Sequence, residues 1–238
     1  MPILWIVVLI FAALLLAFCL GPRPRKPRLD ATLPPPMPDA ASAEARLQAH
    51  EASAPRPIRP DNQARIRWAG EPGQATERCI LYLHGYSASW REGGPVHEAT
   101  AARYGANLLL TRLQAHGLEG PEPMLDFDAE ACWEDAKQAL VLARALGQKI
   151  LLMATSSGAP LALRLAALYP ERIEGLVLYS PNIRIRQPLA PLRAGPGGRQ
   201  RARLVKGSRY NDFPTTGIEQ NYWYSHQRLE GAVQLQQL

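Results

Sequence analysis

Four short apolar runs separated by helical patterns constrain the fold of this chain more than any other feature of its sequence. Each run is nearly continuous in aliphatic residues, which is typical of a strand buried on both faces. The runs cover 78–84, 106–111, 149–154 and 174–180, with a weaker edge strand at 64–68 and helical patterns over 96–104, 128–146 and 157–168. Such strands alternating with helices predict an α/β fold, in which helices flank a mainly parallel sheet.

The third of these strands ends in a corner of small residues around Ser156. The sequence there is ATSSG, from Ala154 to Gly158, and a helical pattern begins directly after it. A strand that ends in small-x-Ser-x-small and leads into a helix predicts a nucleophile elbow, although the usual first glycine is Ala154 here. The Ser156 hydroxyl would stand above the sheet, and the backbone N–H of Ser157 would face the oxyanion of an acyl-transfer intermediate.

Two histidine–glycine pairs follow the neighbouring strands. His84-Gly85 is followed by Tyr86, whose N–H would be the second donor of an oxyanion hole. His116-Gly117 comes after the next strand. We expect both histidines to order their loops by hydrogen bonding rather than to act as bases. The three features together, in this chain order, are more specific than any one of them.

The stretches ILYLHGYSAS, NLLLTRLQAHGL and ILLMATSSGAPLALRLAALYPERIEGLVLYSPN resemble the α/β-hydrolase superfamily, especially its bacterial serine esterases and monoacylglycerol-lipase-like members. The resemblance covers about residues 78–182. It implies hydrolysis of a carboxylic ester, lipid-like or short in its acyl group, with Ser156 as nucleophile and the Tyr86 and Ser157 amides as oxyanion hole. No cofactor or metal is implied. Residues 61–186 would be the core, and 187–238 a cap whose helix over 222–235 covers the site.

The acid and the base of the catalytic triad are harder to place. In the resembled fold both follow the serine along the chain. His226 is the one histidine after Ser156, and it is the possible base. The carboxylates after Ser156 are Glu171, Glu174, Asp212, Glu219 and Glu230, and none is expected just past a strand. Three hypotheses therefore stay open: a C-terminally incomplete hydrolase, an unorthodox site completed by His226, and a tethered binding protein without catalysis.

The N-terminal 60 residues differ in composition from the rest of the chain. Residues 3–20 are apolar without interruption, and four basic residues follow within eight positions. This pattern predicts a transmembrane anchor over 1–20, in a bacterial inner membrane, with the catalytic domain on the cytoplasmic side. A lipoprotein attachment at Cys19 is the alternative. Residues 21–60 contain ten prolines, which predicts a stiff linker with a short helix near 41–53.

The net charge of +6 limits the kinds of partner. Much of it comes from basic residues between 182 and 211, a stretch without an acidic residue, which favours anionic surfaces such as lipid headgroups. No motif or aromatic pattern indicates nucleic-acid binding. The oligomeric state has no signature in the sequence.

Overall fold

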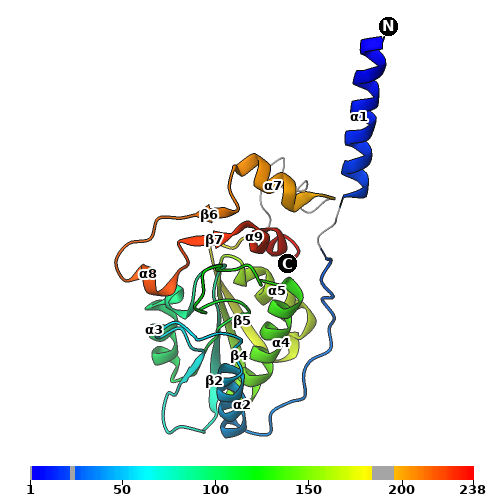
Figure 1. Cartoon of the computed structure of the whole chain (residues 1–238). Helices are drawn as coiled ribbons and strands as arrows, with labels where there is room; N and C mark the ends of the chain where they lie inside the picture. Colours follow the sequence, from blue (N-terminus) through cyan, green and yellow to red (C-terminus); the bar gives the residue numbers. More distant parts are fainter. Residues whose placement is uncertain (1, 22–24, 184–195) are drawn as a thin grey trace.

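The computed structural model describes residues 2–21, 25–183 and 196–238. A five-stranded sheet in the order β1-β3-β2-β4-β5 forms its centre, with helices on both faces (Figure 1). The strands are β1 (Arg65–Arg67), β2 (Thr76–Leu83), β3 (Asn107–Leu110), β4 (Gly147–Thr155) and β5 (Ile173–Tyr179). β2 to β5 pair in parallel, whereas β1 is an antiparallel edge strand. The predicted α/β fold, its four apolar strands and its edge strand are confirmed.

The two faces of the sheet bury different sets of side chains because consecutive residues of a strand point to opposite sides. Along β2, Leu81 and Leu83 join one core cluster, and Ile80 and Tyr82 join the other. The first cluster lies under α4 (Ala129–Leu146) and α5 (Gly158–Leu168), and the second lies under α3 (Val96–Tyr104). These helices match the three predicted helical patterns closely. All these side chains of β2 are fully buried.

The segment expected to be a stiff linker packs on this domain. Helix α2 (Ala40–Ala52) buries Ala43 and Leu47, and Leu29, Leu33 and Met37 pack against the same core cluster. Asp30 fixes the path of the chain, because its carbonyl oxygen accepts the Trp133 indole N–H at 2.8 Å. Its carboxylate pairs with the buried Lys137 ammonium at 3.2 Å. The prolines stiffen the segment, but apolar side chains between them hold it to α4.

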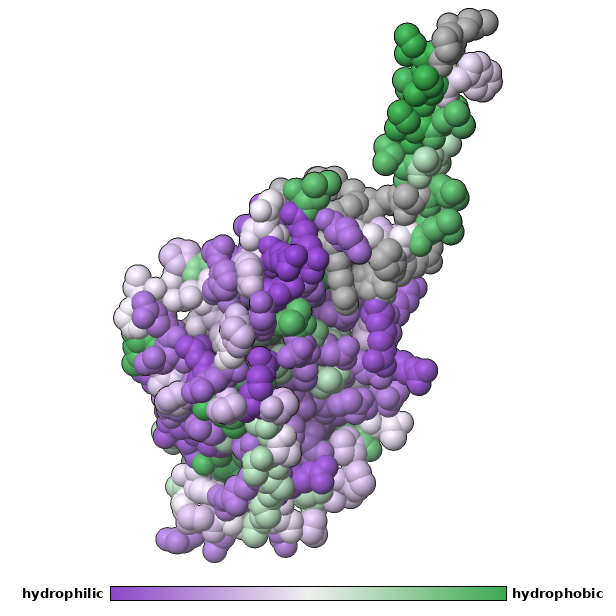
Figure 2. Space-filling model, in the orientation of Figure 1, coloured by the Kyte–Doolittle hydropathy of each residue, from purple (hydrophilic) through white to green (hydrophobic). Residues whose placement is uncertain are grey.

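The prediction of a transmembrane anchor is wrong. Across the residues that the structure describes, no helix combines the length and the hydropathy needed to cross a bilayer. Helix α1 (Pro2–Leu20) has 19 residues. Figure 2 shows hydrophobic side chains gathered along α1. The single-pass membrane localisation and the orientation predicted with it are therefore overturned as well.

The last described segment is a small hairpin between short helices rather than one cap helix. Its elements are α7 (Gly198–Lys206), β6 (Tyr210–Asp212), α8 (Glu219–Tyr222), β7 (His226–Arg228) and α9 (Leu229–Leu235). The helix predicted over 222–235 is thus limited to α9, because residues 226–228 pair antiparallel with 210–212 instead. The first part of the predicted cap, through residue 195, lies outside the described residues.

Candidate active site

Ser156 stands at the corner between β4 and α5 in a strained backbone conformation. Its φ is +49°, in the left-handed region that L-residues rarely adopt. Such a conformation costs on the order of 1–3 kcal/mol and persists only where neighbouring structure imposes it. Here the Ser156 N–H donates to the carbonyl of Tyr179 at 2.9 Å, and its carbonyl accepts the Asn182 N–H at 3.0 Å. The corner is therefore held to the end of β5.

Close packing explains the small residues beside the serine. A Cβ on Gly158 would overlap the carbonyl oxygen of Leu83 and lie 2.8 Å from that of His84. A Cβ on Gly85 would lie 3.1 Å from the Cβ of Ser156. The end of β2 and the elbow thus approach closely enough that Gly158 cannot be replaced without a backbone shift, and a side chain at Gly85 would crowd Glu92 and Ser156. The sequence pattern that predicted the elbow reflects this contact.

The two predicted oxyanion donors have backbone N–H groups without an acceptor. Within the described residues, neither the Tyr86 N–H nor the Ser157 N–H donates to a backbone carbonyl or a side chain. Ser157 is the N-cap residue of α5, where backbone N–H groups lack partners inside the helix and the helix dipole favours negative charge. Both groups remain available to an anionic oxygen near the elbow.

His84 and His116 order the loop that carries Tyr86. The Nε2 of His84 accepts the Leu113 N–H at 3.0 Å, so its Nδ1–H donates to the Gly85 carbonyl at 2.9 Å. His116 accepts the Ser87 N–H on Nε2 at 3.0 Å and donates from Nδ1 to the Gln114 carbonyl at 2.8 Å. Burial lowers the pKa of His84 to about 4 and that of His116 well below its ordinary value. Both are neutral structural residues, as expected.

His226 forms a pair with Asp212 that was not predicted from the sequence. The two residues face each other across the β6–β7 hairpin, and the Nδ1 of His226 lies 2.5 Å from the Oδ1 of Asp212. Tyr210 stacks on the imidazole with ring centroids 3.8 Å apart. A carboxylate that accepts Nδ1–H leaves the lone pair on Nε2, which is the arrangement of a base and its orienting acid. Asp212 was set aside because no strand was expected to end there.

No described contact joins this pair to the serine. Ser156 Oγ has no side-chain hydrogen-bond partner among the described residues, and the side chains of His226 and Asp212 are 50 and 66% exposed. Both belong to the segment that folds over the carboxyl end of the sheet. Helix α9 lies there too, because Gly231 contacts the Tyr86 hydroxyl and Met124 (Figure 1).

Glu92 is a further carboxylate near the elbow, and nothing in the sequence pattern predicted it. It lies on a short 3-10 helix, η1 (Trp90–Gly93), after the Tyr86 loop, and its Oε2 accepts the Gly85 N–H at 2.6 Å. Burial raises its pKa. Across the described residues, no group of three or more His, Cys, Asp or Glu side chains could hold a metal ion.

A mainly parallel sheet with a strained serine between a central strand and a helix is the architecture of the α/β-hydrolase fold. The chain belongs to the alpha/beta hydrolase family, whose model matches residues 80–233, more than half of the chain. The resemblance seen in the sequence is confirmed, and the match includes both the core and the hairpin segment. No curated protein matches the chain.

Solved structures of the same fold include lipolytic enzymes. A structure of the metagenome-derived lipolytic enzymes LipS and LipT is 17% identical, covers 76% of this chain and 69% of that one, and has a TM-score of 0.60. A thermophilic esterase from Thermogutta terrifontis is 18% identical. The match covers 73% of this chain and 65% of that one, with a TM-score of 0.43. Rv0554 from Mycobacterium tuberculosis is 14% identical. The match covers 67% of this chain and 53% of that one, with a TM-score of 0.44.

Proposed function

We propose that this protein hydrolyses carboxylic esters through Ser156. The observation that carries the proposal is the strained φ of +49° at Ser156, with the unengaged N–H groups of Tyr86 and Ser157 on the loops beside it. The base takes the Oγ proton as Ser156 attacks the acyl carbon, and the carbonyl oxygen becomes an oxyanion held by the two amides. The base then gives that proton to the alcohol as it leaves. Water then attacks the acyl-enzyme and releases the acid and free Ser156.

The base in this proposal is His226, oriented by Asp212. Its Nε2 is the free nitrogen of the ring, and the hairpin that carries it belongs to the segment over the carboxyl end of the sheet. The hairpin has to bring Nε2 to Ser156 Oγ when substrate binds, since no contact joins them here. We extend the proposal to esters with an apolar acyl chain by analogy with the lipolytic activity that LipS and LipT are named for.

Fluorophosphonate labelling tests this function directly. The wild-type chain is expected to take up one label, located at Ser156 by mass spectrometry, and Ser156→Ala is expected to take up none. Ser53→Ala, which removes an exposed serine at the end of α2, is the matched control and should label like wild type. Turnover of p-nitrophenyl esters of increasing chain length then gives the acyl preference.

Two variants separate the roles of the His226–Asp212 pair. Loss of the base is expected to lower kcat by roughly 10⁶-fold, and loss of the orienting carboxylate in Asp212→Asn by roughly 10⁴-fold. His226→Ala that labels and turns over like wild type would assign the base elsewhere.

The absence of a described contact between His226 and Ser156 favours a second candidate, a hydrolase-fold binding protein without catalysis. A folded wild-type chain that takes up no label would establish it.

A further inference from the structure

Glu92 lies immediately behind the oxyanion loop. Its Oε2 accepts the Gly85 N–H at 2.6 Å and the Tyr82 hydroxyl at 3.4 Å. A Cβ on Gly85 would lie 2.9 and 3.0 Å from the two carboxyl oxygens and 3.1 Å from the Cβ of Ser156. Because both distances start from the same point, the Oε1 of Glu92 lies no more than 6.0 Å from the Cβ of Ser156. The carboxyl group of Glu92 and the nucleophile therefore lie on either side of the space next to Gly85.

The hydrogen bonds of the loop leave one N–H free. The Gly85 N–H donates to Glu92, the Ser87 N–H to His116, and the Ala88 N–H to the Gly85 carbonyl at 3.3 Å. Between Gly85 and Ala88, Tyr86 alone has an N–H without an acceptor among the described residues. The direction of that N–H is therefore set by the bonds on either side of it, and Glu92 makes the one directly before it.

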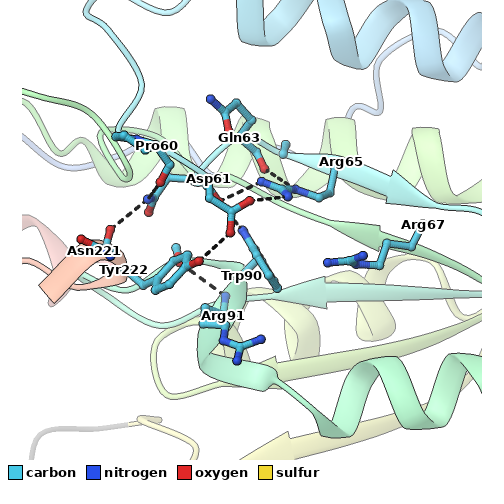
Figure 3. Close-up of polar contacts among 12 residues, drawn as sticks. Pro60, Asp61, Gln63, Arg65, Arg67, Trp90, Arg91, Asn221 and Tyr222 are labelled. Atoms are coloured by element: carbon cyan, nitrogen blue, oxygen red, sulfur yellow. Dashed lines mark hydrogen bonds and ion pairs between the residues drawn. The ribbon is translucent and has the colours of Figure 1, made fainter. Parts of the chain in front are cut away.

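A separate network fixes the 3-10 helix that carries Glu92. The Trp90 indole N–H donates to the Asp61 carbonyl at 2.6 Å (Figure 3). The Asp61 carboxylate accepts the Tyr222 hydroxyl at 2.5 Å and pairs with Arg65 at 2.6 Å. The ring nitrogen Nε2 of His97 donates to the Trp90 carbonyl at 2.9 Å. Trp90 is thus held on both sides, and Glu92 two residues later is directed at Gly85.

We propose that Glu92 is a positioning residue of the oxyanion hole: by accepting the Gly85 N–H it holds the turn in which the Tyr86 N–H faces the Ser156 elbow. This inference rests on the proposed ester hydrolysis. Glu92 forms no ion pair within the described residues, so its contribution is that of a hydrogen-bond acceptor. An amide oxygen can replace a carboxyl oxygen in that role.

Kinetics of two Glu92 variants test the acceptor role. Glu92→Gln keeps an acceptor and is expected to keep kcat within about threefold of wild type. Glu92→Leu removes it, and the misplaced Tyr86 N–H is expected to lower kcat by roughly 10²-fold with KM within about twofold, because the donor acts on the transition state. Glu98→Leu, which replaces a partly exposed glutamate of α3 that pairs with Arg67, is the matched control. A Gln variant as impaired as the Leu variant would overturn the proposal.

Amide hydrogen exchange tests the same inference without turnover. In a folded Glu92→Leu chain, the amides of Gly85 and Ser87 are expected to exchange at least about tenfold faster than in wild type, with Glu92→Gln and Glu98→Leu unchanged. If the Gly85 and Ser87 amides of Glu92→Leu exchange at the wild-type rate, the inference is wrong. If wild type takes up no fluorophosphonate, ester hydrolysis fails as the function, whereas the exchange rates still decide whether Glu92 holds the loop.

Discussion

At the scale of single residues, the elbow depends on two glycines, which carry no side chain where neighbouring atoms come close. Gly158 lies against the carbonyl oxygens of Leu83 and His84, and Gly85 lies between Glu92 and Ser156. Backbone oxygens cannot move aside as the end of a flexible side chain can. The strained Ser156 therefore lies beside positions where an added methyl group would collide with a neighbour. This close packing holds its hydroxyl at the N-terminus of α5.

Gly158→Ala measures this constraint. The added Cβ would overlap the Leu83 carbonyl, so β2 and α5 must separate, and we expect the free energy of unfolding to fall by about 1–3 kcal/mol. Gly175→Ala is the matched control, because its Cβ would meet only Leu151 Cδ1, at 3.4 Å, and its effect should stay within about 0.5 kcal/mol. Urea denaturation of both variants gives the comparison. Equal stabilities would show that the strand and helix can separate without cost.

At the scale of elements, α2 and α4 meet around a polar cavity. The cavity has a volume of about 150 Å³, and Asp135 of α4, His50 of α2 and Arg112 are among its lining residues. Glu51 of α2 pairs with Arg112 at 2.9 Å, with both side chains nearly buried. Burial raises the pKa of Asp135 to about 7, although Arg112 opposes the rise. The contact between the two helices therefore contains a carboxyl group that is protonated at mildly acidic pH.

The pH dependence of stability follows from Asp135. An unfolded aspartate ionises near pH 4, whereas the folded chain keeps this proton up to about pH 7. Between these values the folded state binds one proton more, so the stability falls as pH rises through this window and levels off above it. In Asp135→Asn, the free energy of unfolding measured by urea denaturation should not show this decrease between pH 5 and pH 7.5. The difference between wild type and variant is the quantity to compare, because burial lowers the pKa of His50 in the same cavity and acts in the opposite direction.

At the scale of the whole molecule, the described C-terminal segment is held on the core by a network around Arg228. Its guanidinium donates to Glu122, in the loop before α4, and to Glu230 of α9 at 2.7 Å. The side chains of Arg228 and Glu230 are 9 and 8% exposed. Burial opposes ionisation of Glu230, but hydrogen bonds from Arg228 and Arg203 outweigh it and lower its pKa to about 2. The pair is therefore charged and buried.

Arg228→Ala would leave the Glu230 carboxylate buried without this partner. Because Arg203 still pairs with Glu230, we expect a loss of about 1.5–3 kcal/mol in the free energy of unfolding, or detachment of the segment seen as proteolysis after residue 196. Arg144→Ala breaks a more exposed pair with Glu171 and should cost about 0–1 kcal/mol. If both variants lose the same small amount, the network does not hold the segment in place.

The sequence by itself determined the sheet, the helices around it and the elbow, because these follow from local periodicity and from small residues next to Ser156. It could not determine the contacts between segments that are far apart in the chain. Glu92 was overlooked because its relation to Ser156 appears only when η1 packs under Gly85. The Asp212–His226 pair arises from a hairpin that replaces part of an expected helix. Residues 25–60, proline-rich and expected to form a stiff linker, are held by Trp133 and Lys137, which lie more than 100 positions away from Asp30. Each of these outcomes depends on contacts between residues far apart in the chain, and those form only when the tertiary structure brings the residues together.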